Sequence, residues 1–257
     1  MRYKRSGAML PAALHPYRST GLARYGQGND GGYLVEKQDV DKSDCLISLG
    51  ISNDWSFDKD FCARNDCPVF AYDGSISAGH FLKSAIKTAR FPSRWGGARD
   101  LFATWRDYKA FFQGKRRHFQ KFVGMPSHGS VTLEDIIGQI RREDLGQPFV
   151  KIDIEGSEYR ILDELLNVAD ITTGLAIEFH DCDLHLCRIV DFVKAYPLAL
   201  VHIHANNFSP ISEDGIPLCL ELTFSSSCAR AERTTLPHPL DLPNKASAPD
   251  YDLQFSK

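Results

Sequence analysis

The 257-residue sequence has no apolar run that approaches the ~20 residues needed to cross a bilayer, so we expect no membrane span. Its first nineteen residues contain basic side chains but few apolar ones, and Pro11 interrupts them, which is not typical of a secretory signal peptide. The seven cysteines are odd in number and never occur with CxxC spacing. Free thiols and a cytoplasmic location are therefore predicted.

The whole chain also lacks a surplus of positive charge, since its formal net charge is −3, and we expect no nucleic-acid partner. Residues 83–121 are the exception, with eleven lysines and arginines against Asp100 and Asp107, a net charge of +9. This segment is also rich in aromatic side chains. It is interpreted either as an insertion that presents cations and ring faces to a phosphate-bearing or sugar substrate, or as an amphipathic helix with solvated charges.

A complete GxGxxG phosphate-binding pattern is absent as well. An apolar run at 45–49 ends at Gly50, but Ser52 stands where the pattern requires its second glycine. Because a pyrophosphate needs that close approach to the backbone, NAD binding is disfavoured. Asp73 follows the next apolar run, 69–72, where an acidic residue is placed to hydrogen-bond ribose hydroxyls. Together these features favour an adenosyl ligand without phosphates, of which S-adenosylmethionine is the obvious one.

A stretch near the middle of the chain joins a buried strand to two carboxylates. The apolar run at 149–152 is typical of a buried strand, and Asp153 and Glu155 follow it. Ser157 is a good N-cap with Glu158 next to it, so a helix is predicted to begin there. Because ligands bind at the carboxyl ends of strands in open α/β sheets, the two carboxylates are functional candidates. The alternative is that they only cap the turn.

Strand and helix patterns alternate along the chain. Further strands are predicted at 174–181, 199–205 and 218–224, and the last two are too close in sequence for a crossover helix, so they should pair antiparallel. The predicted fold class is α/β, a doubly wound, mostly parallel sheet with a C-terminal antiparallel hairpin. The predicted parts are a loosely structured N-terminal arm, a main domain that contains the basic insertion, and a proline-rich tail over the surface. Their ranges are 1–22, 23–228 and 229–257.

Several segments resemble the FkbM family of S-adenosylmethionine-dependent methyltransferases, which have the class I methyltransferase fold. They are SLGISNDWSFDKDF at 48–61, FAYDGS at 70–75, and VTLEDI followed by VKIDIEGSEYRIL at 150–162. The segments NDGGY, IEFH and HIHANN are similar to a subset of that family. The resemblance implies methyl transfer to a hydroxyl oxygen, often on a sugar or secondary metabolite. The basic insertion departs from the family pattern.

The resemblance also implies which residues hold the cofactor. Gly50 and its neighbours would line it, Asp73 would hold its ribose, and the two carboxylates after the central strand would sit beside its methionine end or the acceptor. Near the start of the chain, Gly32 would let the backbone approach the ligand, unless its segment is a plain hairpin. The cofactor-binding candidates are Gly32, Gly50, Ser52, Asp73, Asp153 and Glu155.

Methyl transfer to a hydroxyl needs alignment and, because a hydroxyl is a weak nucleophile, a general base. Imidazole has the pKa nearest neutrality, so His180 is the first candidate and His204 the second, with Asp153 as a carboxylate alternative. Further donors at the strand ends are Glu155, Glu178 and His202.

The sequence also allows a metal ion at the site and a function other than catalysis. Magnesium would suit a carboxylate-rich subset, with Asp153, Glu178 and His180 as its ligands, and would acidify a bound hydroxyl. The alternative to an enzyme is a non-catalytic module of the same fold that binds a glycan or a nucleotide-linked ligand through the basic insertion.

Overall fold

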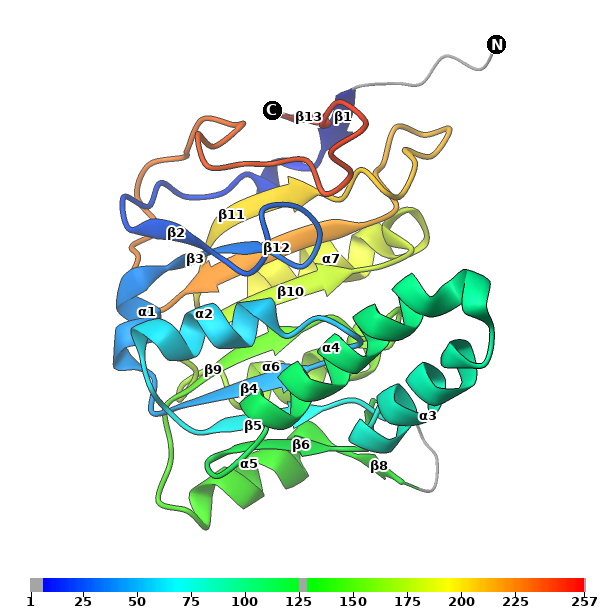
Figure 1. Cartoon of the computed structure of the whole chain (residues 1–257). Coiled ribbons are helices and arrows are strands. Elements are labelled where there is room, and N and C mark those ends of the chain that lie inside the picture. The colour runs from blue at the N-terminus through cyan, green and yellow to red at the C-terminus, as the bar shows by residue number, and fades with distance from the viewer. Residues whose placement is uncertain (1–6, 125–128, 257) are drawn as a thin grey trace.

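The computed structural model describes residues 7–124 and 129–256, and its centre is a seven-stranded sheet (Figure 1). The strand order is β11-β12-β10-β9-β4-β5-β6, in which β12 is antiparallel to both neighbours and the other adjacent pairs are parallel. The predicted fold class, a mostly parallel doubly wound sheet with a C-terminal antiparallel pair, is confirmed. The strands are β4 (Cys45–Leu49), β5 (Val69–Tyr72), β6 (Arg116–Phe119), β9 (Pro148–Ile152), β10 (Gly174–Phe179), β11 (Ala199–Ala205) and β12 (Leu220–Ser225).

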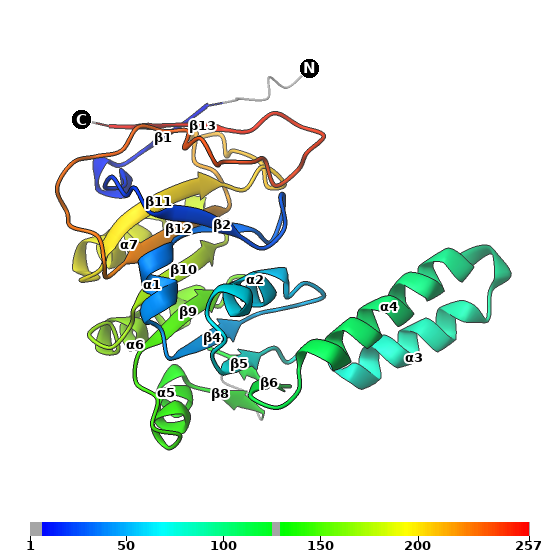
Figure 2. The same ribbon diagram turned by 60° about the vertical axis from the view of Figure 1, so that its left-hand side comes forward.

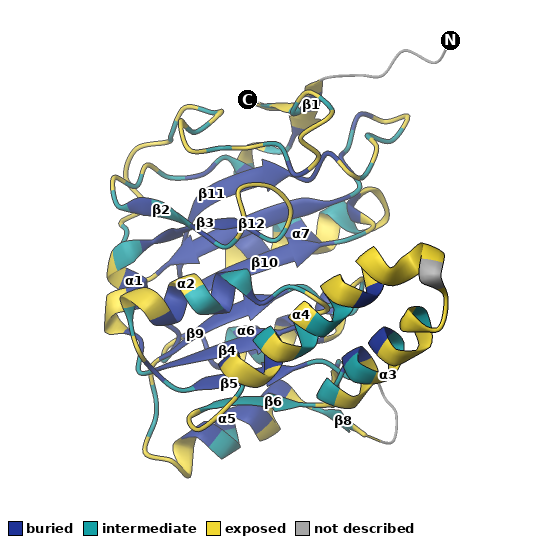
Figure 3. Cartoon of the chain, viewed as in Figure 1, coloured by how far each residue is buried: buried dark blue, intermediate teal, exposed yellow. Residues whose placement is uncertain are grey.

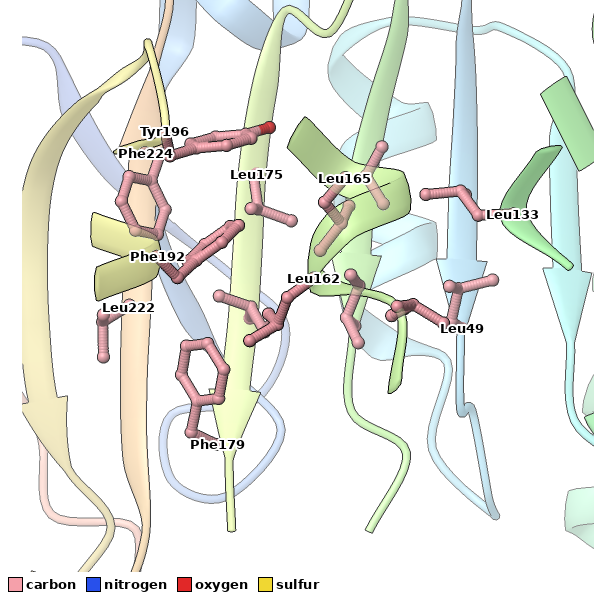
Figure 4. Packing of buried hydrophobic residues seen from close by; sticks show 14 of the residues in the cluster. Leu49, Leu133, Leu162, Leu165, Leu175, Phe179, Phe192, Tyr196, Leu222 and Phe224 are labelled. Atoms are coloured by element: carbon pink, nitrogen blue, oxygen red, sulfur yellow. The ribbon is translucent and has the colours of Figure 1, made fainter. Parts of the chain in front are cut away.

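Helices cover both faces of this sheet, so every residue of β4, β5 and β9 is buried (Figure 3). One face packs against three helices, from which Leu133, Leu165 and Phe192 reach the sheet (Figure 4). On the opposite face the ring centroids of Phe61 and Phe149 lie 5.2 Å apart, with the ring planes tilted by 57°. The helices of the first face are α5 (Leu133–Arg141), α6 (Leu162–Asn167) and α7 (Cys182–Ala195). The opposite face carries β2 (Leu22–Tyr25), β3 (Tyr33–Glu36), α1 (Lys37–Lys42) and α2 (Ser56–Arg64).

The described part of the N-terminal arm is not loose, which corrects the prediction for that segment. β1 (Gly7–Leu10) pairs in parallel with β13 (Asp252–Phe255) at the other end of the chain, and the short helix η1 (Ala12–Leu14) follows. Leu10 and Leu14 are fully buried in the main core. Because the partner of β1 lies far away in sequence, no local sequence pattern predicts this pairing. The predicted domain ranges themselves stay a prediction.

The predicted basic insertion consists of two different structures. α3 (Ala78–Ala89) and α4 (Trp95–Phe111) are joined through η2 (Pro92–Arg94) and form a helical hairpin that projects from the sheet (Figure 2). β6 instead belongs to the central sheet, where it pairs with β5. After β6 comes the short β7 (Phe122–Val123), which pairs with β8 (Ser130–Val131). Among the described residues no helix is long and apolar enough to cross a membrane.

Candidate functional site

A cavity of about 640 Å³ opens at the carboxyl ends of β4, β5, β9 and β10. Strands that run parallel end at one edge of the sheet, so segments far apart in sequence meet there. Most of the predicted site residues line it, namely Gly50, Ser52, Asp73, Asp153, Glu155, Glu178 and His180. In the NDGGY segment the lining residues are Asp30 and Gly31, whereas the predicted Gly32 is buried and does not line the cavity.

Gly50 brings the end of β4 into contact with the end of β9. Its φ is +77°, and a Cβ at this position would lie 1.6 Å from the backbone oxygen of Asp153. Its own carbonyl accepts a hydrogen bond from Nζ of Lys151 at 2.7 Å. A side chain would therefore overlap backbone rather than a movable group, and only glycine allows this approach.

Asp73 ties the loop after β4 to the end of β5. Its Oδ2 accepts hydrogen bonds from the backbone N–H of Ile51 at 3.1 Å and of Ser52 at 2.7 Å, and its Oδ1 accepts from Ser75. Burial opposes the charged form, but the hydrogen bonds from Ser75, Ser52 and Ile51 outweigh it and lower the pKa of Asp73. The carboxylate is therefore charged at neutral pH and holds the loop in place.

The turn after β9 differs from the predicted helix start. Glu155 and Gly156 both have positive φ, so the chain doubles back before any helix begins. Ser157 makes no capping hydrogen bond with its side chain, and a short 3-10 helix η3 (Glu158–Arg160) precedes α6. Glu158, expected in the first helical turn, is fully buried, and its Oε1 accepts hydrogen bonds from the backbone N–H of Ile154 and Gly156. This side chain holds the turn together from inside.

His180 follows β10 and faces this turn. Its Nδ1 lies 3.1 Å from Oε1 of Glu158, and its Nε2 lies 3.5 Å from Glu155 and 3.9 Å from Asp153. Burial favours the neutral ring, but the hydrogen bond and charge of Glu158, with the charges of Glu178 and Asp153, raise the pKa of His180 to about 9. One ring nitrogen is thus held by a buried carboxylate, and the other is surrounded by the acids of the cavity.

Glu178, the last acid of β10, is engaged by three side chains. Tyr33 donates its hydroxyl to Oε2 at 2.8 Å, and Oε1 accepts from Nδ2 of Asn206 at 2.9 Å and from Sγ of Cys219 at 2.7 Å. Burial, together with the charges of Asp153 and Glu221, raises the pKa of Glu178. Both oxygens of this carboxylate therefore already accept hydrogen bonds from other side chains of the protein.

The histidines of β11 do not join the cavity. His204 lies between Glu221 and Asp250, with its ring nitrogens 3.2 and 2.9 Å from their carboxylates, and His202 lies 2.8 Å from Asp241. Neither histidine lines the cavity. His204, predicted as the second candidate base, and His202 therefore do not lie beside Asp153 and Glu155, because β12 separates β11 from β10.

Acidic side chains dominate the wall of the cavity. Two lysines and His180 are the basic groups that line it, and Lys151 lies buried with its Nζ 3.6 Å from Asp153. Lys151 lies within the apolar run at 149–152, and a lone cation in such a run is itself a sign of a buried partner. The seven carboxylates that line the cavity are Asp30, Asp54, Asp58, Asp73, Asp153, Glu155 and Glu178.

Within the described residues two groups have donor atoms close enough to share a metal ion. Asp153, Glu155 and His180 form the first, and Glu178, His180 and Cys219 form the second, with the donor atoms of each group within 4.8 Å of one another. The predicted set of Asp153, Glu178 and His180 is thus divided between the two groups.

No protein-family model matches the chain, and a search of curated proteins finds no match either. Several of the solved structures to which it is similar are described as methyltransferases. An rRNA methylase from Streptococcus thermophilus superposes with a TM-score of 0.39 and 12% identity over 74% of this chain and 93% of the other. A precorrin-6y C5,15-methyltransferase from Geobacter metallireducens does so with a TM-score of 0.36 and 13% identity over 74% and 84%. Similarity at this level does not extend to activity, and membership of the FkbM family stays a prediction.

Proposed function

We propose that the chain is an S-adenosylmethionine-dependent methyltransferase that acts on a hydroxyl oxygen of a sugar, a glycan or a secondary metabolite in the cytoplasm. The observation that carries this proposal is the excess of acids at the carboxyl ends of the strands, where seven carboxylates and two lysines line one cavity. S-adenosylmethionine has a positively charged sulfonium and no phosphate. Such a ligand suits an acidic cavity, whereas an anionic ligand would be repelled.

The loop after β4 supports a ligand without a pyrophosphate. Dinucleotides use backbone N–H groups of this loop and of the following helix to bind their phosphates. Here the N–H groups of Ile51 and Ser52 both donate to Asp73 instead. Because these two N–H groups are already occupied, a nucleotide-linked ligand, as proposed for a non-catalytic binding module, is also disfavoured.

Asp73 is the residue we assign to the ribose. Its two oxygens already accept hydrogen bonds, but one donor is the hydroxyl of Ser75, which can rotate and leave an acceptor for a ribose hydroxyl. Gly50 and Ser52 would lie along the adenosyl group. Asp153, which leaves β9 beside Gly50, would lie toward the methionine end.

The residues of the turn then supply the chemistry at the acceptor. When bound, S-adenosylmethionine supplies an activated methyl group, whose carbon–sulfur bond breaks as the acceptor oxygen attacks, with the electron pair kept by sulfur. His180 takes the hydroxyl proton at Nε2, while Glu158 holds Nδ1 and so fixes the ring orientation. Without a ligand, a pKa of about 9 keeps this imidazole mostly protonated at neutral pH. The sulfonium of the bound cofactor would place a positive charge beside the ring and favour its neutral form, which can accept the proton. Alignment of the reactants contributes about 7–11 kcal/mol and the base about 10²–10⁴-fold in rate.

A divalent cation is the alternative use of the same turn. Asp153, Glu155 and His180 offer two carboxylates and an imidazole, and Mg²⁺ prefers carboxylate oxygens. Glu178 is less suited than predicted, because three side chains already donate to it. Calorimetric titration with Mg²⁺ separates the two uses. If the wild type binds Mg²⁺ and Glu155→Gln binds it more weakly, the turn is a metal site. If the wild type does not bind Mg²⁺, His180 remains the proposed base.

Two measurements test the proposed function. Titration calorimetry with S-adenosylmethionine should show saturable binding to the wild type, and incubation with a panel of sugars should release S-adenosylhomocysteine. His180→Ala should keep cofactor binding but lose at least ~10²-fold in turnover. Folded protein that gives no heat at high cofactor concentration would refute the proposal, and full turnover by His180→Ala would refute the choice of base.

A further inference from the structure

The hairpin of α3 and α4, residues 78–111, projects away from the rest of the molecule (Figure 2). It is called the arm and is distinct from the N-terminal arm at residues 1–22. α4 has 17 residues, which gives the arm a length of about 25 Å. At its base the arm is fixed, because Asp107 pairs with Lys59 of α2. Phe81 packs against Trp55 at this base, with ring centroids 6.0 Å apart, and Ala85 and Ala98 are buried. The arm is thus an ordered hairpin that is anchored at its base, and its far end projects into solvent.

The outer part of the arm carries five cations against one acid, Asp100, which directly follows Arg99. From Gly74 to Arg99 the sequence contains no aspartate or glutamate. The five cations of this stretch are all exposed, and within the described residues none of them forms an ion pair with an acid. They are Lys83, Lys87, Arg90, Arg94 and Arg99. This surface therefore fits an anionic partner, in contrast to the acidic cavity near the base of the arm.

Most of the outer part of the arm is coloured as exposed in Figure 3, and three large apolar residues there are exposed. Ile86 is 48% exposed, Phe91 52% and Trp95 64%. The indole N–H of Trp95 donates to the backbone oxygen of Ala89 at 3.1 Å, which holds the ring in place without covering it. The guanidinium of Arg94 lies 5.6 Å from the ring of Phe91. Apolar groups and cations are thus mixed on one tip rather than separated.

We propose that the tip of the arm docks onto a bilayer surface that contains anionic lipids, with Phe91 and Trp95 among the headgroups and the surrounding cations against the lipid phosphates. Aromatic and aliphatic side chains amid lysines and arginines are the composition that binds such interfaces. A nucleic acid is the other polyanion that the charges would attract. It is disfavoured because an extended strand would also pass the acid-lined cavity near the base of the arm, which repels a polyanion, whereas a bilayer would contact only the tip. The inference does not depend on the proposed methyl transfer.

Flotation of the full chain with vesicles tests the inference. The protein should float with vesicles of phosphatidylglycerol and phosphatidylcholine in equal parts, not with pure phosphatidylcholine, and added salt should weaken binding. The double substitution Phe91→Ala/Trp95→Ala should lower vesicle affinity by about tenfold or more. Tryptophan emission should shift to the blue on binding. That shift should be lost in Trp95→Phe, which should still bind.

Leu184 offers a matched control, because it is 75% exposed on α7 and lies outside the arm. Leu184→Ala should bind vesicles as the wild type does, and thermal unfolding should show that every variant is folded. The proposal is overturned if the wild type does not bind anionic vesicles or binds both vesicle types equally. It is also overturned if the double variant binds anionic vesicles as tightly as the wild type. Tighter binding to a single-stranded RNA oligonucleotide than to the vesicles would overturn it in favour of a nucleic-acid surface.

Discussion

Nδ1 of His180 and Oε1 of Glu158 lie 3.1 Å apart, and this contact joins the end of β10 to the turn after β9. The same Oε1 accepts the backbone N–H of Ile154 and Gly156, so one oxygen shapes the turn and orients the imidazole. Glu158 has no exposed surface and is not a residue of the cavity wall. It acts on the site through His180, as a positioning residue.

Replacing Glu158 by glutamine should lower kcat by about 10–100-fold with little change in KM for S-adenosylmethionine. Glutamine keeps an oxygen for the backbone of the turn but removes the charge that faces His180. Steady-state release of S-adenosylhomocysteine would measure both constants. Asp163→Asn, the same change of acid to amide at an exposed position of α6, should leave them unchanged. Equal kcat for Glu158→Gln and the wild type would contradict the positioning role.

Asp73→Asn should weaken S-adenosylmethionine binding by roughly 10–150-fold, the range expected when a charged hydrogen-bond partner is lost. The substitution takes away both the acceptor proposed for the ribose and one anchor of the loop at Ile51 and Ser52. Calorimetry gives the dissociation constant directly. Asp214→Asn, at an exposed turn, is the control. An unchanged constant for Asp73→Asn would remove this residue from the cofactor site.

Gly50→Ala should destabilise the fold by more than ~2 kcal/mol, since a left-handed backbone costs about 1–2 kcal/mol for an L residue even before any overlap. The new methyl group would also meet the backbone oxygen of Asp153. Gly96→Ala is the contrasting substitution, because a Cβ there meets nothing within 4 Å. It should be neutral or stabilise α4 by up to ~1 kcal/mol. Urea unfolding of both variants tests the pair, and equal stability would refute the close approach.

His204 should make stability depend on pH in the alkaline range. Burial opposes its charge, but hydrogen bonds to Asp250 and Glu221 raise the pKa of His204 from 6.5 to about 10. The folded state therefore binds the proton more tightly than the unfolded state. The stabilisation is full below pH 6.5 and is lost as the pH rises toward 10.

His204→Gln should accordingly cost on the order of 3 kcal/mol below neutral pH and much less near the upper end of that range. The free energy of unfolding, measured by denaturant at several pH values, would give the difference between the variant and the wild type. A difference that stays constant across the range would show that the histidine is not charged in the folded state.

The central strands and the ends of β4 and β5 follow from short-range patterns in the sequence. Apolar runs predict strands because most residues buried on both faces of a sheet are apolar. Gly50 and Asp73 could be located in the same way, since each directly follows such a run and the edge of a parallel sheet is where ligands bind. These residues do line the cavity.

The remaining features depend on which strands become neighbours. The pairing of β1 with β13, the position of β11 beyond β12, and the contact between Glu158 and His180 all join segments that are distant in sequence. Residue periodicity describes which face a side chain takes, and it carries no information on the order of strands in a sheet. The sequence alone therefore determined the fold class and the edge at which the site lies. The tertiary structure decided which histidine reaches that edge and which carboxylate holds it, because strand order sets those distances.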